Sequence, residues 1–274
     1  MRSLLSGALC VASLFSMSCS APAWQKVDRQ AQLLGFERST EEGSKFRHVV
    51  YTPARKPSGS RVHVYIDGDG VNWQWGRFVR ADPTPGRALM LELMGLDRGN
   101  TLFVGRPCYF GLELDDTCGA DYWTYARYSK KVVSSMVDVI ARRTSQYSEV
   151  VLFGHSGGGA IALLIAEQLP KVKAVVTVAG NIDTEAWTQH HGYTPLYGSL
   201  NPAKRAPLPA TIRQLHLVGA QDTNIPPSLT TPWIDDQPAA SLRVIPNNTH
   251  LCCWNKDWAA VLRWVASQES LVNR

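Results

Sequence analysis

The sequence predicts an α/β protein with a mostly parallel central sheet covered by helices. Short apolar runs typical of buried strands alternate with segments of helical apolar spacing along most of the 274 residues. One run, 150–153, ends in a glycine-rich turn and is followed at once by a helix-like segment, 160–166. With 45% apolar residues the chain can bury a large core, and we expect a single domain over 24–274.

The predicted strands share short length and β-branched or aromatic content. In chain order they are 36–39, 46–51, 61–66, 101–104, 150–153, 172–178, 212–218 and 241–245. A polar turn at 41–44 makes a hairpin of the first two. The others are separated by longer segments, so parallel pairing with right-handed crossovers is expected.

Helical apolar spacing recurs between these strands. The predicted helices are 87–94, 128–140, 160–166 and 254–267, after a helical or irregular entry at 24–35. Residues 180–210 are rich in proline and aromatic residues and predict a short lid-like insertion over the strand ends. Its adjacent His190 and His191 do not share a face, so we expect them to be structural or surface residues.

The N-terminus has the pattern of a signal peptide, residues 1–18. Arg2 precedes an apolar run at 4–15 that is too short to span a bilayer. Residues 16–19 resemble a bacterial lipobox with Cys19 as the lipidated residue, although Ser16 stands where a Leu-like residue is usual. The alternative is ordinary cleavage near residue 23. We therefore expect an exported protein, either an envelope lipoprotein anchored to the membrane through Cys19 or a periplasmic or secreted protein.

Export implies an oxidising compartment, where disulfides persist. We favour a Cys108–Cys118 bond, which closes a loop of about ten residues and contributes roughly 2–3 kcal/mol by loop entropy. Adjacent cysteines such as Cys252 and Cys253 have Cα atoms about 3.8 Å apart across a trans peptide, below the usual disulfide minimum of about 4.4 Å. A vicinal bridge is therefore not the default, and two cross-links from 108 and 118 to 252 and 253 are the main alternative.

Composition excludes several classes of protein. The formal net charge of +5 is spread over the chain, with no run longer than two basic residues, so no nucleic-acid partner is expected. No nucleotide-binding fingerprint is present, and we predict no cofactor. The cysteine spacing does not resemble a zinc site, so no metal is predicted. No pattern specifies an oligomeric state.

The glycine-rich turn at 154–158 reads Gly-His-Ser-Gly-Gly. A strand, a sharp Gly-X-Ser-X-Gly turn and a helix together make a nucleophile elbow, with Ser156 at the end of the strand. The free amides and dipole of the following helix favour negative charge beside that serine. The alternative is a plain glycine-rich turn in which Ser156 is only a small residue.

A serine nucleophile needs a base, an acid that orients the base, and N–H donors for the oxyanion. Asp222 follows strand 212–218, and His250 follows the last strand, so both should meet Ser156 at one edge of the sheet. Asp183 is the replacement candidate for the acid. Asp235 and Asp236 are weaker candidates.

The expected oxyanion donors are backbone amides. One is the amide of Gly157, and the second comes from Gly68 or Asp69 in the turn after strand 61–66. The carboxylates of Asp67 and Asp69 would oppose an oxyanion unless they point away or are hydrogen-bonded. A plain Asp/Gly loop is the alternative for this turn.

Trp73 and Trp75 follow that turn closely. They either line an acyl or aromatic pocket beside the site or serve only in packing. The sequence favours neither role over the other.

On these residues the chain resembles the α/β-hydrolase superfamily over nearly all of the region after the signal peptide. The resemblance implies Ser156 as nucleophile, His250 as base, Asp222 as acid and the Gly157 amide in the oxyanion hole. It departs at 67–68, where many members have His-Gly and this chain has Asp-Gly. It implies hydrolysis of a small-molecule carboxylic ester through an acyl-enzyme. A serine peptidase or amidase, or a non-catalytic envelope binding lipoprotein, are the alternatives.

Overall fold

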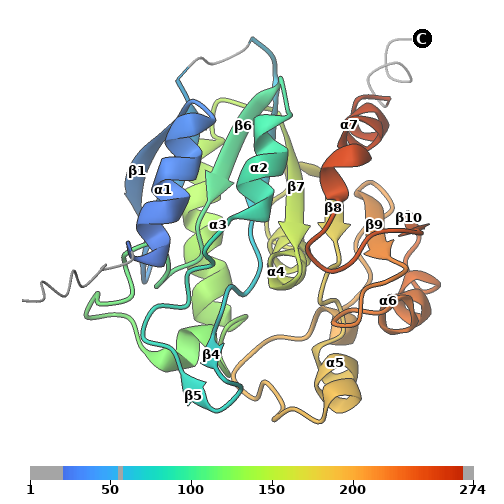
Figure 1. Ribbon diagram of the computed structural model, residues 1–274. Helices are drawn as coiled ribbons and strands as arrows, with labels where there is room; N and C mark the ends of the chain where they lie inside the picture. Colours follow the sequence, from blue (N-terminus) through green and yellow to red (C-terminus); the bar gives the residue numbers. More distant parts are fainter. Residues whose placement is uncertain (1–20, 55–57, 268–274) are drawn as a thin grey trace, which may run out of the picture.

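The computed structural model describes residues 21–54 and 58–267. The predicted signal peptide and Cys19 lie outside the described residues. An eight-stranded sheet occupies the centre of the described part (Figure 1). Its strands are β1 (Phe36–Glu42), β2 (Arg47–Pro53), β3 (Arg61–Ile66), β6 (Asn100–Val104), β7 (Glu149–His155), β8 (Val172–Val178), β9 (Arg213–Gly219) and β10 (Ala240–Ile245).

The strand order is β1-β2-β6-β3-β7-β8-β9-β10. Strand β2 is antiparallel to both β1 and β6, and all other neighbours are parallel. This confirms the predicted, mostly parallel sheet. Because the chain returns through helices, the carboxyl ends of β3, β7, β8, β9 and β10 lie at one edge.

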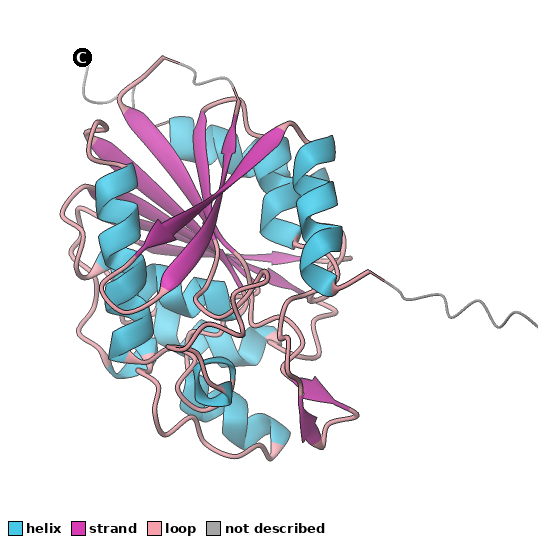
Figure 2. Ribbon diagram, turned by 90° about the vertical axis from the view of Figure 1, so that its left-hand side faces the viewer, coloured by secondary structure: helices cyan, strands magenta, loops and turns pink. Residues whose placement is uncertain are grey.

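Helices cover both faces of the sheet (Figures 1 and 2). Helices α1 (Ala23–Leu33), α2 (Leu89–Gly95) and α7 (Trp258–Ala266) lie on one face. Helices α3 (Lys130–Arg143) and α4 (Gly157–Ala166) lie on the other. All ten residues of α4 are buried, as expected of a helix that is apolar on every side. The described part of the chain also contains three short 3₁₀ turns, at 120–123, 202–204 and 254–256.

Two helices and a hairpin were not predicted. Helix α5 (Thr184–His191) lies inside the expected irregular insertion, and α6 (Pro227–Ile234) precedes β10. The small hairpin of β4 (Trp73–Gln74) and β5 (Phe78–Val79) projects from the lower end of the molecule in Figure 1.

Helix α5 has clear end signals in the sequence. The Asp183 carboxylate accepts hydrogen bonds from the amides of Glu185 and Ala186, and Gly192 ends the helix in the left-handed conformation at φ 64°. Proline and aromatic content around the helix hid these signals.

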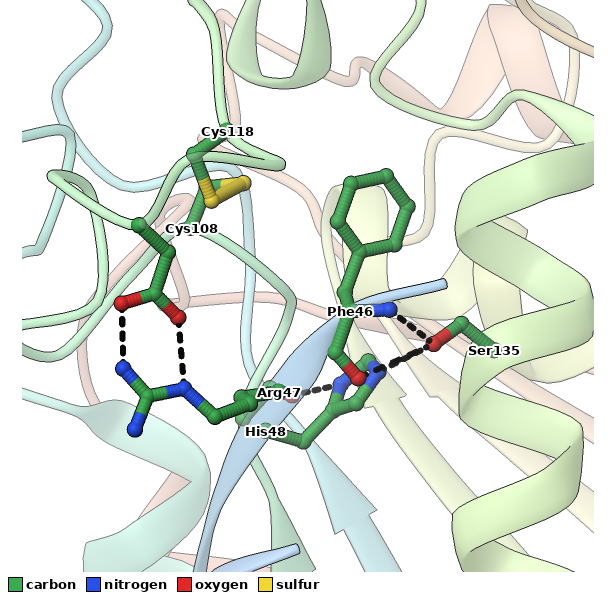
Figure 3. The surroundings of a disulfide bond; sticks show 8 residues. Phe46, Arg47, His48, Cys108, Cys118 and Ser135 are labelled. Carbon is green, nitrogen blue, oxygen red and sulfur yellow. Dashed lines mark hydrogen bonds and ion pairs between the residues drawn. A yellow bond between two sulfur atoms is a disulfide. The ribbon is translucent and has the colours of Figure 1, made fainter. Parts of the chain in front are cut away.

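The 108–118 loop is closed by a disulfide between Cys108 and Cys118, with Cα atoms 5.5 Å apart (Figure 3). Arg47 on β2 makes two hydrogen bonds to the Asp115 carboxylate in this loop. The neighbouring His48 donates from Nδ1 to the Gly105 carbonyl (3.0 Å), and its Nε2 meets the Ser135 hydroxyl of α3 (2.8 Å). The loop and α3 are therefore both attached to β2.

The second disulfide differs from the default expectation. Cys252 and Cys253 are joined to each other across a cis peptide, so neither is linked to Cys108 or Cys118.

Within residues 21–54 and 58–267, no helix has the length and apolar content needed to cross a membrane.

Candidate active site

The turn between β7 and α4 holds Ser156 in a strained backbone conformation, φ 51° and ψ −121°. The flanking glycines make this turn sterically feasible. A Cβ at Gly154 would collide with the backbone of Gly158, and one at Gly158 would collide with the carbonyl of Ile66. The Ser156 carbonyl accepts from the Asn181 amide (2.9 Å), which ties the turn to the end of β8.

The structure brings Ser156, His250 and Asp222 together at the carboxyl edge of the sheet. His250 Nε2 lies 3.0 Å from Ser156 Oγ, and His250 Nδ1 lies 2.9 Å from Asp222 Oδ2. The other Asp222 oxygen accepts from the amides of Asn224 and Ile225, both at 2.8 Å. The Asp222 side chain is fully buried and has a hydrogen-bond partner on each oxygen.

The replacement candidates for the acid lie elsewhere. Asp183 caps α5 and also accepts from Asn201 (2.9 Å). Asp235 and Asp236 are exposed at the end of α6. Of the four aspartates considered, Asp222 is the one that contacts His250.

His250 is mostly buried, and its environment favours the neutral imidazole. Burial lowers the pKa of His250 below its usual value, the hydrogen bond to Asp222 opposes this, and the nearby His155 ring adds to the lowering. An Nδ1–H that donates to Asp222 leaves the Nε2 lone pair facing Ser156. That is the arrangement a general base needs.

His155 was not singled out from the sequence beyond its place in the Gly-X-Ser-X-Gly turn. Its Nε2 donates to the backbone carbonyl of His250 (3.0 Å), and Trp254 Nε1 donates to the same carbonyl (3.2 Å). These two bonds fix the backbone that carries the His250 ring.

Asn224 is a second residue that the sequence did not single out. Its Nδ2 lies 3.0 Å from His250 Nε2, its Oδ1 accepts from Trp187 Nε1 (3.2 Å), and its carbonyl accepts from His191 Nε2 (2.8 Å). Asn224 thus joins the base to α5. Its place two residues after Asp222 in the same strand-end loop was the available signal. His191 serves structurally here.

The three predicted oxyanion donors lie beside Ser156. Gly157 is the first residue of α4, where amides have no intrahelical acceptor. The Gly68 backbone lies against Ser156 Cβ, but its amide donates to Asp67 Oδ1 (2.9 Å) and is already used. Among the described residues the Asp69 amide has no acceptor. Gly68 is therefore a poor donor, and the Asp69 amide is the better candidate.

The negative charge of the Asp69 carboxylate, which lies near the serine, is balanced by neighbouring groups. It forms ion pairs with Arg106 and with Arg127 (2.9 Å), and it accepts from the Tyr128 hydroxyl (2.6 Å). Burial alone would raise the pKa of Asp69, but the two arginine charges and the Tyr128 hydroxyl outweigh it and hold that pKa well below its usual value. We call Asp69, Arg106, Arg127 and Tyr128 the Asp69 cluster.

The Asp69 cluster was not predicted. Arg106 comes two residues after β6, and Arg127 lies between the 106–125 loop and α3. A basic residue placed after a central strand was the available signal for Arg106. Nothing local marked Arg127.

A cavity of about 710 Å³ opens beside Ser156 and His250. Much of its wall is apolar, including Val71, Trp73, Leu89, Trp187, Leu196 and Leu251. Trp73 therefore lies where a pocket residue was expected. Trp75 does not line the cavity, and its side chain is 83% exposed, so the pocket prediction for Trp75 is wrong. Trp75 sits in a left-handed turn position (φ 53°) at the hairpin tip, which turns it to solvent.

Comparison with known proteins agrees with this architecture. The family profile for the α/β-hydrolase fold matches residues 114–201. No curated protein matches the sequence significantly.

Solved structures match over most of the chain. Est1E from Butyrivibrio proteoclasticus gives a TM-score of 0.61 at 13% identity, covering 85% of this chain and 99% of Est1E. Est1E with ferulic acid bound gives 0.62 at 12% identity, with the same coverage of both chains. An esterase from Pyrococcus furiosus gives 0.57 at 12% identity, covering 89% of this chain and 92% of the esterase. At such identities the likeness concerns the fold alone, and the chain has the α/β-hydrolase fold.

Proposed function

We propose that this protein is a serine hydrolase that cleaves a carboxylic ester through an acyl-enzyme intermediate. The observation that carries the proposal is the continuous chain of contacts from Ser156 Oγ to His250 Nε2 and from His250 Nδ1 to Asp222 Oδ2. Both distances are within hydrogen-bond range, and the serine occupies a strained, glycine-flanked turn.

In the proposed acylation step, Ser156 Oγ attacks the ester carbonyl carbon while His250 Nε2 takes the serine proton. Asp222 stabilises the imidazolium through Nδ1–H. The amides of Gly157 and Asp69 receive the oxyanion. The tetrahedral intermediate collapses, the C–O bond to the alcohol breaks, and His250 returns its proton to the departing oxygen.

In the second half of the reaction, a water attacks the acyl-enzyme. His250 takes a proton from this water, the second tetrahedral intermediate breaks the bond to Ser156, and His250 returns the proton to Oγ. The products are a carboxylic acid and free enzyme, so atoms and charges balance without a cofactor.

The cavity supports a small-molecule substrate with an apolar or aromatic group. Its volume of about 710 Å³ lies in the range of small-molecule sites, and Trp73 and Trp187 contribute flat apolar surface. Est1E, which shares the fold, has been solved with ferulic acid, an aromatic acid. We therefore expect an ester of an apolar or aryl acid.

The experiment that tests the proposal uses a fluorophosphonate probe on the exported, disulfide-intact protein. Labelling is expected for the parent and for Ser148→Ala, whose serine is exposed and remote from the cavity, and is expected to be lost in Ser156→Ala and His250→Ala. Absence of labelling in a folded parent would favour a non-catalytic binding protein.

Substrate panels then separate ester from amide chemistry. We expect turnover of aryl and acyl esters of rising chain length and little turnover of peptide amides. Faster cleavage of the amides would favour the serine peptidase or amidase alternative, because the same three residues serve both reactions.

We also propose that the protein is exported and lipidated at Cys19, and the Cys108–Cys118 bond supports an oxidising compartment. Radiolabelled palmitate should be incorporated into the parent and not into Cys19→Ala. A parent without label would favour a soluble periplasmic or secreted protein.

A further inference from the structure

The mouth of the cavity is surrounded by exposed apolar side chains. Thirteen large apolar residues are exposed within residues 21–54 and 58–267, and seven of them lie at this mouth or on the β4–β5 hairpin that forms part of it. We call these seven the apolar rim: Val71, Trp75, Phe78, Val79, Tyr125, Tyr193 and Leu251. Scattered exposed apolar residues need no explanation, but a cluster around one opening marks an interaction surface.

The hairpin is the most prominent part of the rim. Trp73 and Gly76 line the cavity, whereas Trp75 and Phe78 are 83% and 55% exposed and contact each other edge to face, with ring centroids 6.3 Å apart. The hairpin projects away from the central sheet at the end of the molecule that also carries α5 (Figures 1 and 2). The apolar side chains are therefore presented to the surroundings.

The turn of this hairpin has an unusual residue for its conformation. Trp75 and Gly76 both have positive φ, 53° and 65°, and Arg77 N–H donates to the Gln74 carbonyl (3.1 Å). A β-turn with positive φ at both central residues favours Asn-Gly, because a bulky side chain is strained there. Trp75 is strained and exposed, and its contact with Phe78 is itself on the surface, so packing within the fold does not account for it.

Two arginines on or beside the hairpin favour a negatively charged partner. Arg77 is exposed with its guanidinium 5.7 Å from the Phe78 ring centre, and Arg80 lies just after β5. Within the described residues neither arginine pairs with an acidic side chain. Tryptophan with arginine at an exposed edge suits the interface of a bilayer with anionic headgroups, where the ring enters the acyl boundary and the cation stays at the phosphates.

We propose that the apolar rim docks on an anionic phospholipid surface, with Trp75 and Phe78 inserted at the headgroup level. Docking would place the cavity mouth against the bilayer, so that an ester dissolved in the lipid reaches Ser156 without crossing water. The delivery of such an ester rests on the function proposed above. The docking itself does not, and it can be measured on a protein without activity.

The first experiment measures insertion with Ser156→Ala protein in its exported form. Vesicles of equimolar phosphatidylcholine and phosphatidylglycerol carry bromine on the acyl chains, which quenches tryptophan that enters the bilayer. We expect quenching that is largely lost in Trp75→Phe. A shared N-terminal acyl anchor would not mimic this result, since it is the same in both proteins. Equal quenching of the two proteins would overturn the proposal.

The charge contribution is tested with Arg77→Gln and with Lys173→Gln, an exposed lysine on β8, as the matched control. The lipid concentration for half-maximal quenching should rise about fivefold for Arg77→Gln on anionic vesicles. It should not change on pure phosphatidylcholine, nor for Lys173→Gln. The same response on both kinds of vesicle would overturn the proposed headgroup contact.

The second experiment uses active protein and compares an ester held in vesicles with a soluble short-chain ester. Trp75→Ser/Phe78→Ser should lower kcat/KM for the vesicle ester by more than about tenfold, since two aromatic side chains lose their apolar contact. The soluble ester should be hydrolysed as before, because neither residue lines the cavity. The control is Leu33→Ser/Leu114→Ser, whose leucines are 81% and 88% exposed away from the mouth, and no change is expected.

Two results would separate the possible failures. Hairpin-dependent quenching with no hydrolysis of any ester would reject the proposed function and keep the docking surface. A hairpin-dependent dimer by light scattering, without quenching, would assign the rim to contact between copies of this chain and overturn the lipid proposal.

Discussion

Asn224 connects the acid–base pair to helix α5, and its amide orientation is determined by its neighbours. Trp187 Nε1 can only donate, so the atom that it meets is the Asn224 oxygen, and Nδ2 must face His250 Nε2. Nδ2 and the Ser156 hydroxyl therefore share one lone pair of the neutral imidazole. If Nε2 of His250 were protonated, its N–H would point at the N–H of Asn224 Nδ2, and two donors cannot hydrogen-bond to each other. Asn224 therefore favours the neutral form of His250.

Replacing Asn224 by alanine should therefore raise the pKa of His250. A single hydrogen bond of about 0.5–1.5 kcal/mol corresponds to a shift of up to about one pH unit. Because His250 must be neutral to accept the serine proton, the acidic limb of kcat/KM should move to higher pH. The measurement is kcat/KM for a soluble ester across the acidic limb. Asn247→Ala, an exposed asparagine in the loop before His250, should leave the limb in place. An unmoved limb in Asn224→Ala would contradict the assignment.

Asp222 and Asp183 should respond differently to the same substitution. Asp222→Asn replaces the acceptor at His250 Nδ1 with an amide that can hold the wrong tautomer, and kcat should fall by as much as about ten-thousand-fold with the fold retained. Asp183→Asn changes the cap of α5 and the hydrogen bond from Asn201, and neither contact involves His250, so most activity should remain. Steady-state kinetics of both variants decides, and the reverse ranking would transfer the acid role to Asp183.

At the scale of elements, the turn after β3 depends on charges supplied by two other segments. Arg106 follows β6, Arg127 precedes α3, and both are almost completely buried around the Asp69 carboxylate. A Cβ at Gly157 would collide with that carboxylate, so the cluster packs directly under the start of α4. The cluster therefore holds the β3 turn, which carries the Asp69 amide, against the Ser156 turn.

Asp69→Asn should be strongly destabilising. The change keeps the shape of the side chain but leaves two buried guanidinium groups without their counter-ion, which typically costs about 3–5 kcal/mol. Urea unfolding followed by circular dichroism measures the loss. Asp116→Asn, at an exposed position in the disulfide loop, is the control and should change the free energy of unfolding by less than about 0.5 kcal/mol. A loss of unfolding free energy as small as that of the control would contradict this prediction, because it would mean that water solvates the two guanidinium groups in place of the Asp69 carboxylate.

At the scale of the whole molecule, two buried histidines should make the fold sensitive to acid. Burial lowers the pKa of His48 to about 4 and that of His216 to about 3, from 6.5 when exposed. Below pH 6.5 the unfolded chain binds protons that the folded chain does not, so stability falls as the pH drops from 6.5 toward these values. The loss is on the order of 3 kcal/mol or more for each histidine over the whole window.

Urea unfolding between neutral pH and about pH 4 should therefore show a falling midpoint. His216→Gln removes one of the two groups and should flatten the pH dependence, whereas His190→Gln, at an exposed position of α5, should not. An unchanged slope in His216→Gln would contradict the contribution of that residue.

The sheet was predictable because its strands depend on local pattern. Run 150–153 is apolar throughout and lies inside β7, and run 172–178, apolar except for Lys173 and Thr177, coincides with β8. The helices α5 and α6 were missed because their apolar periodicity is weak and prolines lie in or beside them. Helix α5 is held by its end caps and by contacts with the loop that carries Asn224, and α6 packs on β9 and β10. No short window of sequence displays these contacts.

The sequence by itself determined the strand, turn and helix around Ser156, because the close approaches at positions 154, 157 and 158 of such a turn leave no room for a Cβ, and all three positions are glycine. It also determined that the residues after β9 and β10 share an edge with that serine, since parallel strands bring their carboxyl ends together. Only the tertiary structure decided that Asp222 and not Asp183 meets His250, that Asn224 faces the same nitrogen, and that Trp75 points to solvent. It also assembled the Asp69 cluster from residues up to 59 positions apart. Such choices depend on side-chain contacts between segments that are distant in sequence, whereas the turn and the sheet follow from local backbone sterics and apolar pattern.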